Sequence, residues 1–312
     1  MDELGRIAML ARVLGTARAG LEVGIGDDAA VLSTASLAGQ RLVWTIDEQV
    51  EGVHFRRDLV SWRDVGWRAT MAAASDVAAM GAAPWCTLAA LVLPLDVDDA
   101  ALEGIARGQR EAADALGAPV VGGNLARGPA LSLATTLLGT CERAVERRGA
   151  RSGDGVWLAG RVGLAAAGLR ALERRRGDEP ALAAAVAAWR TPHALVTEGL
   201  AMGAVASAAV DVSDGLARDA GHLAEASEVS LVLDEAALVD DAALRDSARA
   251  LDESAIDLAL HGGEDYALVV TSARPIEGFR RIGEVRAGAG LILRGPWGER
   301  PLEPRGFDHF GG

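Results

Sequence analysis

The sequence contains no lysine, so all 31 of its Lys and Arg positions are arginine. Alanine and glycine are abundant as well, which suggests a compositional bias of the source genome, so arginine richness by itself does not indicate a binding site. Acidic residues outnumber the arginines, and the formal net charge is -13. Because an acidic surface repels phosphate backbones, we do not expect nucleic acid as a partner.

Cysteine is also scarce. Cys86 and Cys141 both stand in apolar surroundings, which favours buried thiols in a reducing compartment over a disulfide framework, and no zinc-ligand spacing is present. The first residues are acidic and lack a signal-peptide core, and apolar runs such as 87–95 are too short to span a bilayer. We therefore expect a cytoplasmic protein with no membrane association.

The remaining composition is that of an ordinary globular protein, half hydrophobic and 24% charged. A chain of 312 residues favours two domains of roughly 150 residues each. The polar, breaker-rich segment 147–154 marks the boundary. The sequence thus predicts an N-terminal domain over 1–146 and a C-terminal domain over 147–312.

Hydrophobic periodicity predicts alternating helices and strands, typical of an α/β protein. In the first half we expect helices over 1–14, 62–81 and 99–116, and strands over 41–46, 87–95, 119–121 and 130–140. Gly122-Gly123-Asn124 is interpreted as a turn between the last two strands. In the second half the pattern predicts strands over 156–159, 229–233, 266–271 and 291–293, and helices over 164–173, 180–189, 194–205 and 215–226.

Carboxylates gather at separate points of the first half. Asp27 and Asp28 occupy a Gly-flanked turn, where they are either turn formers or, since adjacent carboxylates repel each other, partners of a cation. Asp47 ends an apolar strand, where ligands collect. Asp76 interrupts an apolar helical run, and a charge in that setting must be paired, hydrogen-bonded or metal-bound.

Two more clusters follow in the second half. Asp211 and Asp214 stand at the start of a predicted helix with Ser213 between them; Asp211 could simply cap that helix, but capping does not explain Asp214. Glu264 and Asp265 precede the only tyrosine of the chain, at the mouth of a predicted strand.

The commonest nucleotide and hydrolase signatures are missing. There is no P-loop, no kinase glycine-rich loop and no Ser-His-Asp arrangement. Magnesium prefers oxygen ligands and binds polyphosphates through one or two carboxylates per ion. The dispersed aspartates, taken together, therefore predict a nucleotide site with several magnesium ions.

The ordered motifs resemble the thiamine-monophosphate kinase family. They are Gly24-Ile25-Gly26-Asp27-Asp28, Glu51-Gly52-Val53-His54-Phe55, Ser75-Asp76-Val77-Ala78-Ala79-Met80-Gly81-Ala82, Asp211-Val212-Ser213-Asp214-Gly215-Leu216, Gly263-Glu264-Asp265-Tyr266 and Gly306-Phe307-Asp308-His309-Phe310. The match runs nearly end to end. It also implies the wider superfamily of aminoimidazole ribonucleotide synthetase and selenide water dikinase.

This resemblance implies a two-domain fold that binds ATP and a homodimer whose N-terminal domains form a β-barrel-like core. The implied reaction moves the γ-phosphoryl group of ATP onto thiamine monophosphate, with Asp28, Asp47 and Asp214 in catalytic positions. The family's magnesium positions fall on Asp28, Thr45, Asp47, Asp76, Asp211 and Asp214. Its ATP contacts fall on Gly123, Asn124, Arg147 and Ser213, and its acceptor contacts on His54, Glu264 and Phe307.

One departure from the family pattern affects this reading. The family usually has Gly-Gly-Asp-Thr where this chain has Gly122-Gly123-Asn124-Leu125, so a metal-binding carboxylate has become a neutral amide. Ala73 replaces a common Asn, and Ile46 a frequent Thr. These changes keep open a related kinase or synthetase with another acceptor, or a non-catalytic nucleotide-binding paralogue.

Overall fold

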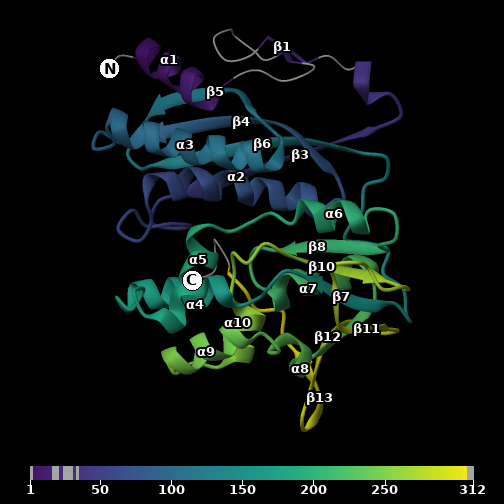
Figure 1. The fold of residues 1–312 in the computed structure, drawn as a ribbon. Helices are drawn as coiled ribbons and strands as arrows, with labels where there is room; N and C mark the ends of the chain where they lie inside the picture. Colours follow the sequence, from purple (N-terminus) through teal and green to yellow (C-terminus); the bar gives the residue numbers. More distant parts are fainter. Residues whose placement is uncertain (1–2, 16–20, 24–30, 33–34, 308–312) are drawn as a thin grey trace. The chain divides into compact units, whose positions relative to one another are not determined.

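The computed structural model describes residues 3–15, 21–23, 31–32 and 35–307. The chain divides into two compact units (Figure 1). The first unit contains residues 1–77 and 82–142, and the second contains residues 78–81 and 143–312.

The first unit is built on a four-stranded sheet with the strand order β3-β6-β4-β5. Its strands are β3 (Arg41–Val50), β4 (Ala83–Leu93), β5 (Val120–Arg127) and β6 (Ser132–Cys141). β6 pairs antiparallel with β3 and β4, whereas β4 and β5 are parallel. Parallel strands need a long crossover, which here includes α3 (Asp99–Leu116). The other elements are α1 (Glu3–Leu14), β1 (Leu21–Val23), β2 (Val31–Leu32), η1 (Ala35–Leu37) and most of α2 (Trp62–Ala79).

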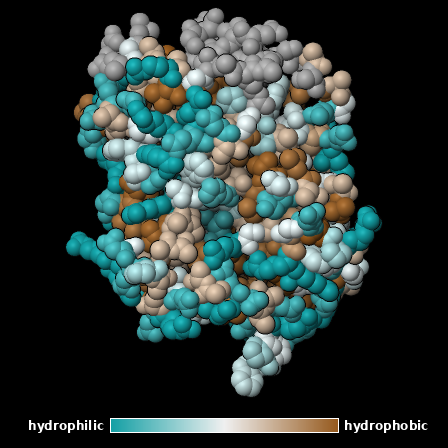
Figure 2. All heavy atoms as spheres, in the orientation of Figure 1, coloured by the Kyte–Doolittle hydropathy of each residue, from teal (hydrophilic) through white to brown (hydrophobic). Residues whose placement is uncertain are grey.

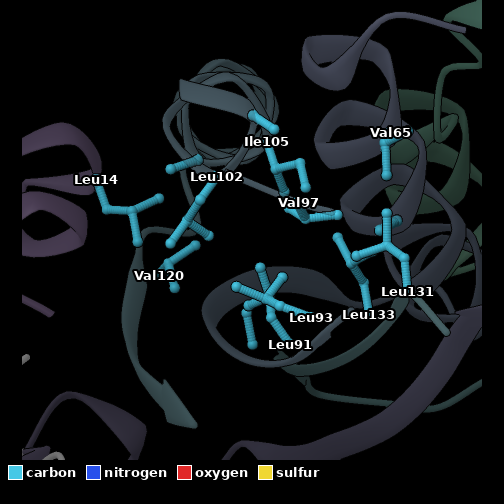
Figure 3. Packing of buried hydrophobic residues seen from close by; sticks show 14 of the residues in the cluster. Leu14, Val65, Leu91, Leu93, Val97, Leu102, Ile105, Val120, Leu131 and Leu133 are labelled. Carbon is cyan, nitrogen blue, oxygen red and sulfur yellow. The ribbon is translucent and has the colours of Figure 1, made fainter. Parts of the chain in front are cut away.

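Helix α3 shows why the sequence folds in this way. Its N-cap Asp98 accepts the backbone N–H of Ala101 at 2.8 Å, and Gly117 ends it in the left-handed conformation at φ 63°. Leu102 and Ile105 are fully buried on one side of the helix, against the inward side chains of the sheet such as Leu91 (Figure 3). Helices therefore cover this face of the sheet.

Among the described residues, none covers the other face of the first sheet. Residues along β6 alternate between buried and partly buried, the pattern of a strand with one covered face. On β3 the outward Leu42, Trp44 and Ile46 are 55%, 74% and 68% exposed. In the described part of the chain, β3 and β5 remain the two edges of the sheet, so the barrel-like core expected from the sequence is not formed as a closed barrel here.

The second unit contains a seven-stranded sheet with the order β13-β12-β9-β11-β7-β10-β8. Only the β9–β12 pair is parallel among these neighbours. All six residues of β10 are buried, as expected for an interior strand covered on both faces. The strands are β7 (Gly155–Ala159), β8 (Ala208–Val212), β9 (Ser230–Asp234), β10 (Ala267–Ser272), β11 (Arg280–Arg286), β12 (Gly290–Gly295) and β13 (Gly298–Leu302).

Helices pack on this second sheet and on one another (Figure 1). α7 contacts β8, β9 and β12, and α4 contacts α5, α9 and α10. On another part of the sheet, Met202 of α6 packs with Leu268 and Val270 of β10. The helical elements are α4 (Leu164–Glu173), η2 (Pro180–Leu182), α5 (Ala183–Arg190), α6 (Val196–Met202), α7 (Leu216–Ser227), α8 (Glu235–Leu238), α9 (Ala242–Leu251) and α10 (Ala255–His261).

The surface carries many paired charges. On β11 to β13, Arg286 and Arg294 share Glu284 and Glu299, and hydrophilic side chains cover much of the face drawn in Figure 2. Cys86 and Cys141 are buried and form no disulfide with each other, as expected. None of the helices in the described ranges is long and apolar enough to cross a bilayer.

Three expectations from the sequence are wrong. Asp47 does not end its strand, because β3 continues to Val50. Gly122-Gly123-Asn124 is not a turn but lies inside β5, because Gly123 lets β5 approach β4 so closely that a Cβ there would collide with the carbonyl of Ala89. Asp211 does not start a helix; it lies in β8, and α7 begins only at Leu216.

Candidate functional site

In the first unit, two predicted metal ligands are in direct contact. Thr45 and Asp47 are two residues apart on β3, so their side chains leave the same face of the strand. The Thr45 hydroxyl donates a hydrogen bond to Oδ2 of Asp76 at 2.5 Å. Asp76 is the one partly exposed residue among the buried neighbours 71–79 of α2, so it is neither an orphan charge nor part of an exposed helix face.

The donor atoms around this pair suit magnesium. Thr135 lies directly opposite Asp47 in the β3–β6 register, and its buried hydroxyl has no hydrogen-bond partner among the described residues. Hydroxyl and carboxylate oxygens are the ligands that magnesium prefers. Within the described ranges no three His, Cys, Asp or Glu residues are close enough to hold a metal ion, and Asp27 and Asp28 lie outside those ranges.

His54 follows β3 and is held by the backbone. Its Nδ1 accepts the N–H of Val50 at 3.0 Å, so a neutral ring carries its proton on Nε2. The next residue, Phe55, is buried in the core, whereas His54 is only partly buried. His54 is therefore not simply a packing residue.

The predicted ATP contacts lie in different places. Gly123 and Asn124 are exposed on β5. Arg147 is exposed, and its carbonyl accepts the hydroxyl of Ser227, the last residue of α7. Since α7 has 12 residues at about 1.5 Å each, the Arg147 backbone lies roughly 18 Å from the loop that precedes this helix.

That loop, Ser213-Asp214-Gly215, joins β8 to α7. Oδ2 of Asp219, one turn into the helix, accepts three consecutive backbone N–H groups: Ser213 at 3.0 Å, Asp214 at 3.0 Å and Gly215 at 3.2 Å. Gly215 has φ 119°, a conformation that glycine adopts without strain. This backbone requirement explains a glycine beside Asp214.

Asp219 is only 4% exposed, and Asp211 is 5% exposed. Burial, together with the charges of Asp211 and Asp214, raises the pKa of Asp219 to about 7, although the backbone N–H groups oppose the shift. Asp219 was not predicted as a site residue from the sequence. The available signal was an acidic residue between Ala217 and Ala220 on the apolar side of a predicted helix.

The segment Gly263-Glu264-Asp265-Tyr266, which contains the predicted phosphate-acceptor contact Glu264, is hydrogen-bonded to the same part of the chain. The N–H of Glu264 donates to the Ser213 carbonyl at 2.7 Å, and the N–H of Tyr266 donates to Val212 at 2.8 Å. Both residues are left-handed, with φ 63° and 50°. Such conformations cost free energy and concentrate at functional sites.

Side chains hold this segment from both sides. Oε2 of Glu264 accepts the indole N–H of Trp189 at 2.8 Å. Asp265 accepts the N–H groups of Gly163 at 2.5 Å and Ala165 at 3.0 Å, at the start of α4. Burial raises the pKa of Asp265 to about 7, with the Glu264 charge acting in the same direction. Asp265 is thus an anchor of α4.

Phe307 also reaches the loop. Its N–H donates to the Asp214 carbonyl at 2.9 Å, and its own carbonyl accepts from Arg218, whose Nε lies 3.6 Å from Oδ2 of Asp214. The Phe307 residue is 45% exposed. The structure therefore brings Ser213, Asp214, Glu264 and Phe307 together; the predicted tail motif beyond 307 lies outside the described residues.

Comparisons with known proteins show which proteins this chain resembles. The family model "AIR synthase related protein, N-terminal domain" matches residues 26–141. The chain is 33% identical to thiamine-monophosphate kinase of Aquifex aeolicus over 99% of both chains, and 35% identical to that of Escherichia coli K12 over 98% of both.

Solved structures give the same result. The structure "AaThiL complexed with AMPPCP and TMP" is 32% identical with a TM-score of 0.82, over 99% of this chain and 97% of that one. Thiamine-monophosphate kinase from Stenotrophomonas maltophilia is 34% identical with a TM-score of 0.81, over 93% and 95%. The hydrogenase maturation protein HypE of E. coli, at 20% identity and a TM-score of 0.79, shares the fold.

Proposed function

The chain belongs to the thiamine-monophosphate kinase family, and we propose that it transfers the γ-phosphoryl group of ATP directly to the phosphate of thiamine monophosphate. The product is thiamine diphosphate. The observation that carries this proposal is the backbone bonding of Glu264 and Phe307 to the Ser213-Asp214 loop, because it joins acceptor and polyphosphate residues in one assembly. AaThiL, a relative over nearly the full length, was solved with AMPPCP and TMP.

Direct phosphoryl transfer needs alignment and charge neutralisation more than a strong base. Magnesium ions, when bound, would neutralise the polyphosphate. In the first unit Asp28, Thr45, Asp47 and Asp76 would hold them, with Thr45 orienting Asp76 through their hydrogen bond. In the second unit Asp211 and Asp214 would do so. We propose Asp28, Asp47 and Asp214 as the catalytic residues.

We assign some of the proposed contacts to the phosphates of ATP and others to its nucleoside. The Ser213 hydroxyl, in the loop beside Asp214, would donate to a phosphate. Arg147, at the far end of α7, would meet the nucleoside end, beside a cavity of about 380 Å³ that Glu146, Arg148 and Ser227 help to line. In the first unit, the exposed backbone at Gly123 and Asn124 would contribute a further contact.

The acceptor residues suit a cationic, ring-containing molecule. The Glu264 carboxylate can balance the positive charge of the thiazolium ring. The partly exposed Phe307 can pack against an aromatic ring. His54, with its proton on Nε2, can donate to the acceptor phosphate.

The direct test is to incubate the protein with ATP, magnesium and thiamine monophosphate and to detect thiamine diphosphate by chromatography. Formation of thiamine diphosphate with consumption of one ATP supports the proposal. Asn124, exposed and neutral on β5, favours the alternative of another acceptor or a non-catalytic paralogue. Nucleotide binding without thiamine diphosphate formation would support that alternative.

We extend the proposal to a homodimer formed by the first unit, in the predicted domain 1–146. Leu42, Trp44 and Ile46 form an exposed apolar strip on β3. Across the sheet, Ile46 pairs with Thr136 on β6, and Thr136 pairs with Leu88 on β4, which is 38% exposed. Exposed apolar patches of this kind mark interaction sites. A second copy would cover this face and complete the barrel-like core, while domain 147–312 would supply the α/β part of the enzyme.

A cytoplasmic location fits the two cysteines. Cys86 and Cys141 are buried and form no disulfide with each other. Burial raises the pKa of the Cys141 thiol, which disfavours the reactive thiolate. Both residues are therefore suited to remain thiols in a reducing compartment.

A further inference from the structure

The Ser213-Asp214-Gly215 loop points three consecutive backbone N–H groups at a single oxygen, Oδ2 of Asp219. Successive N–H groups that converge in this way form a nest, the device by which many loops hold a phosphate. In this chain the nest is filled by one of its own carboxylates.

The carbonyl groups of the loop are engaged as well. The Ser213 carbonyl accepts the N–H of Glu264, and the Asp214 carbonyl accepts the N–H of Phe307. The backbone of these two residues is thus bonded through both its N–H and its C=O groups. The N–H groups of Ser213 and Asp214 are therefore not available to a phosphate, whereas both residues are partly exposed and can offer their side chains to a ligand.

We infer that Asp219 is a positioning residue that decides which charge the loop accepts. With its carboxylate in the nest, the loop meets a polyphosphate through a cation held by Asp211 and Asp214, and its backbone does not bind the phosphate. This inference rests on the proposed function, since it explains how the same site recognises ATP without a P-loop.

A purely structural role for Asp219 makes different predictions. An acidic residue in the first turn of α7 would stabilise the helix through its dipole. That effect needs no burial, yet Asp219 is 4% exposed and lies near two like charges. Burying a carboxylate beside other carboxylates is costly, so a role in helix stability alone does not account for its position.

The test compares two ligands of opposite charge on three proteins: the natural protein, Asp219→Ala and Asp154→Asn. Asp154 is a matched control, because it is a buried carboxylate of the same unit that accepts the N–H of Arg151 at 3.0 Å and the hydroxyl of Ser207 at 2.6 Å. Manganese binding at fixed AMPPCP is followed by electron paramagnetic resonance. Inorganic phosphate binding without divalent ions is followed by calorimetry.

For Asp219→Ala we expect manganese affinity to fall about tenfold and phosphate affinity to rise about tenfold, because an emptied nest attracts an anion and no longer orders the loop. Asp154→Asn should leave both affinities unchanged, even if its melting temperature falls. Natural affinities in Asp219→Ala, with only a lower melting temperature, would overturn the inference.

If Asp219→Ala does not fold, Asp219→Asn decides, since it keeps the side-chain shape and loses the charge. Its manganese affinity should also fall, and an unchanged affinity would overturn the inference. Both titrations omit thiamine monophosphate, so they separate this inference from the proposed function. A natural protein that fails to form thiamine diphosphate would refute the function alone.

Discussion

The indole Nε1 of Trp189 donates a hydrogen bond to Oε2 of Glu264 over 2.8 Å, across 75 residues of sequence. Trp189 belongs to α5 and is only 1% exposed, so the surrounding core fixes its position. The strained, left-handed Glu264 is thereby held in one orientation. The core of the second unit thus orients a predicted acceptor residue.

Replacing Trp189 by Phe keeps an aromatic ring and removes the donor. We expect the KM for thiamine monophosphate to rise about fivefold to tenfold, which corresponds to about 1 kcal/mol, the net contribution of a typical hydrogen bond, with the KM for ATP unchanged. Initial rates with each substrate varied in turn measure both constants. Trp157→Phe is the control, since its indole donates to the Ser272 carbonyl at 3.2 Å elsewhere in the unit. Equal rises in both KM values would contradict this role.

Thr45→Val removes the hydroxyl that orients Asp76. The magnesium concentration for half-maximal activity should rise several-fold, because a carboxylate without its hydrogen bond is less well ordered for the ion. A magnesium titration of the rate at saturating ATP measures the effect. Thr45→Ser keeps the hydroxyl and should restore the natural curve; failure of this rescue would indicate a packing effect.

Asn124→Asp restores a carboxylate at the position where the family usually has one. Attraction to a divalent ion is largely offset by desolvation and by repulsion from other carboxylates, so we expect a net gain of about 1 kcal/mol. The magnesium titration should shift several-fold to lower concentration, without loss of folding. Superimposable curves would mean that residue 124 does not face the ions.

The buried carboxyls predict a pH dependence of stability. In the folded protein the pKa of Asp265 is raised to about 7, so the folded state binds the proton more tightly than the unfolded state. Its contribution to stability is complete below pH 4 and is lost as the pH rises to about 7. Asp219 acts in the same direction.

Asp265→Asn cannot ionise, so its stability should not show this loss. The melting temperature of Asp265→Asn minus that of the natural protein should become more positive between pH 5 and pH 8, by a few degrees at about 2–4 °C per kcal/mol. Thermal unfolding across this range measures the difference. A constant difference would show that Asp265 keeps an ordinary pKa.

The open sheet face predicts the oligomeric state. Trp44→Asp places a charge in the middle of the apolar strip and should convert a dimer into a monomer, as seen by light scattering after size-exclusion chromatography. Leu95→Asp is the control, because Leu95 is 85% exposed but follows β4 outside the sheet. A natural protein that is monomeric at micromolar concentration would disprove the dimer.

Local signals fixed some elements well. Helix α3 was predicted over 99–116 as observed, because its apolar periodicity, Asp98 cap and Gly117 end all agree. The prediction of a turn at Gly122-Gly123 was wrong, because the same glycines that favour turns also permit close strand pairing. In the second unit, helices α8 to α10 and strands β8, β11 and β13 were not predicted, whereas the strand expected over 291–293 is β12.

Some residues of the candidate site could likewise be predicted from the sequence, and others could not. Motif order led to Asp214, Glu264 and Phe307, and the structure brings these three together. Asp219 and Trp189 were missed, because each acts through a contact that the sequence does not display. An aspartate within a helix and a tryptophan in an alanine-rich segment look like ordinary core and surface residues until their partners are known.

The Asp214 loop is bonded to both Glu264 and Phe307, and this has a consequence for how the binding of one substrate affects the affinity for the other. A displacement of the loop on nucleotide binding would be transmitted through these two backbone hydrogen bonds to Glu264 and Phe307, the predicted acceptor residues. By thermodynamic reciprocity, the acceptor then changes nucleotide affinity by the same factor. The two substrates are therefore expected to change each other's affinity by one common factor.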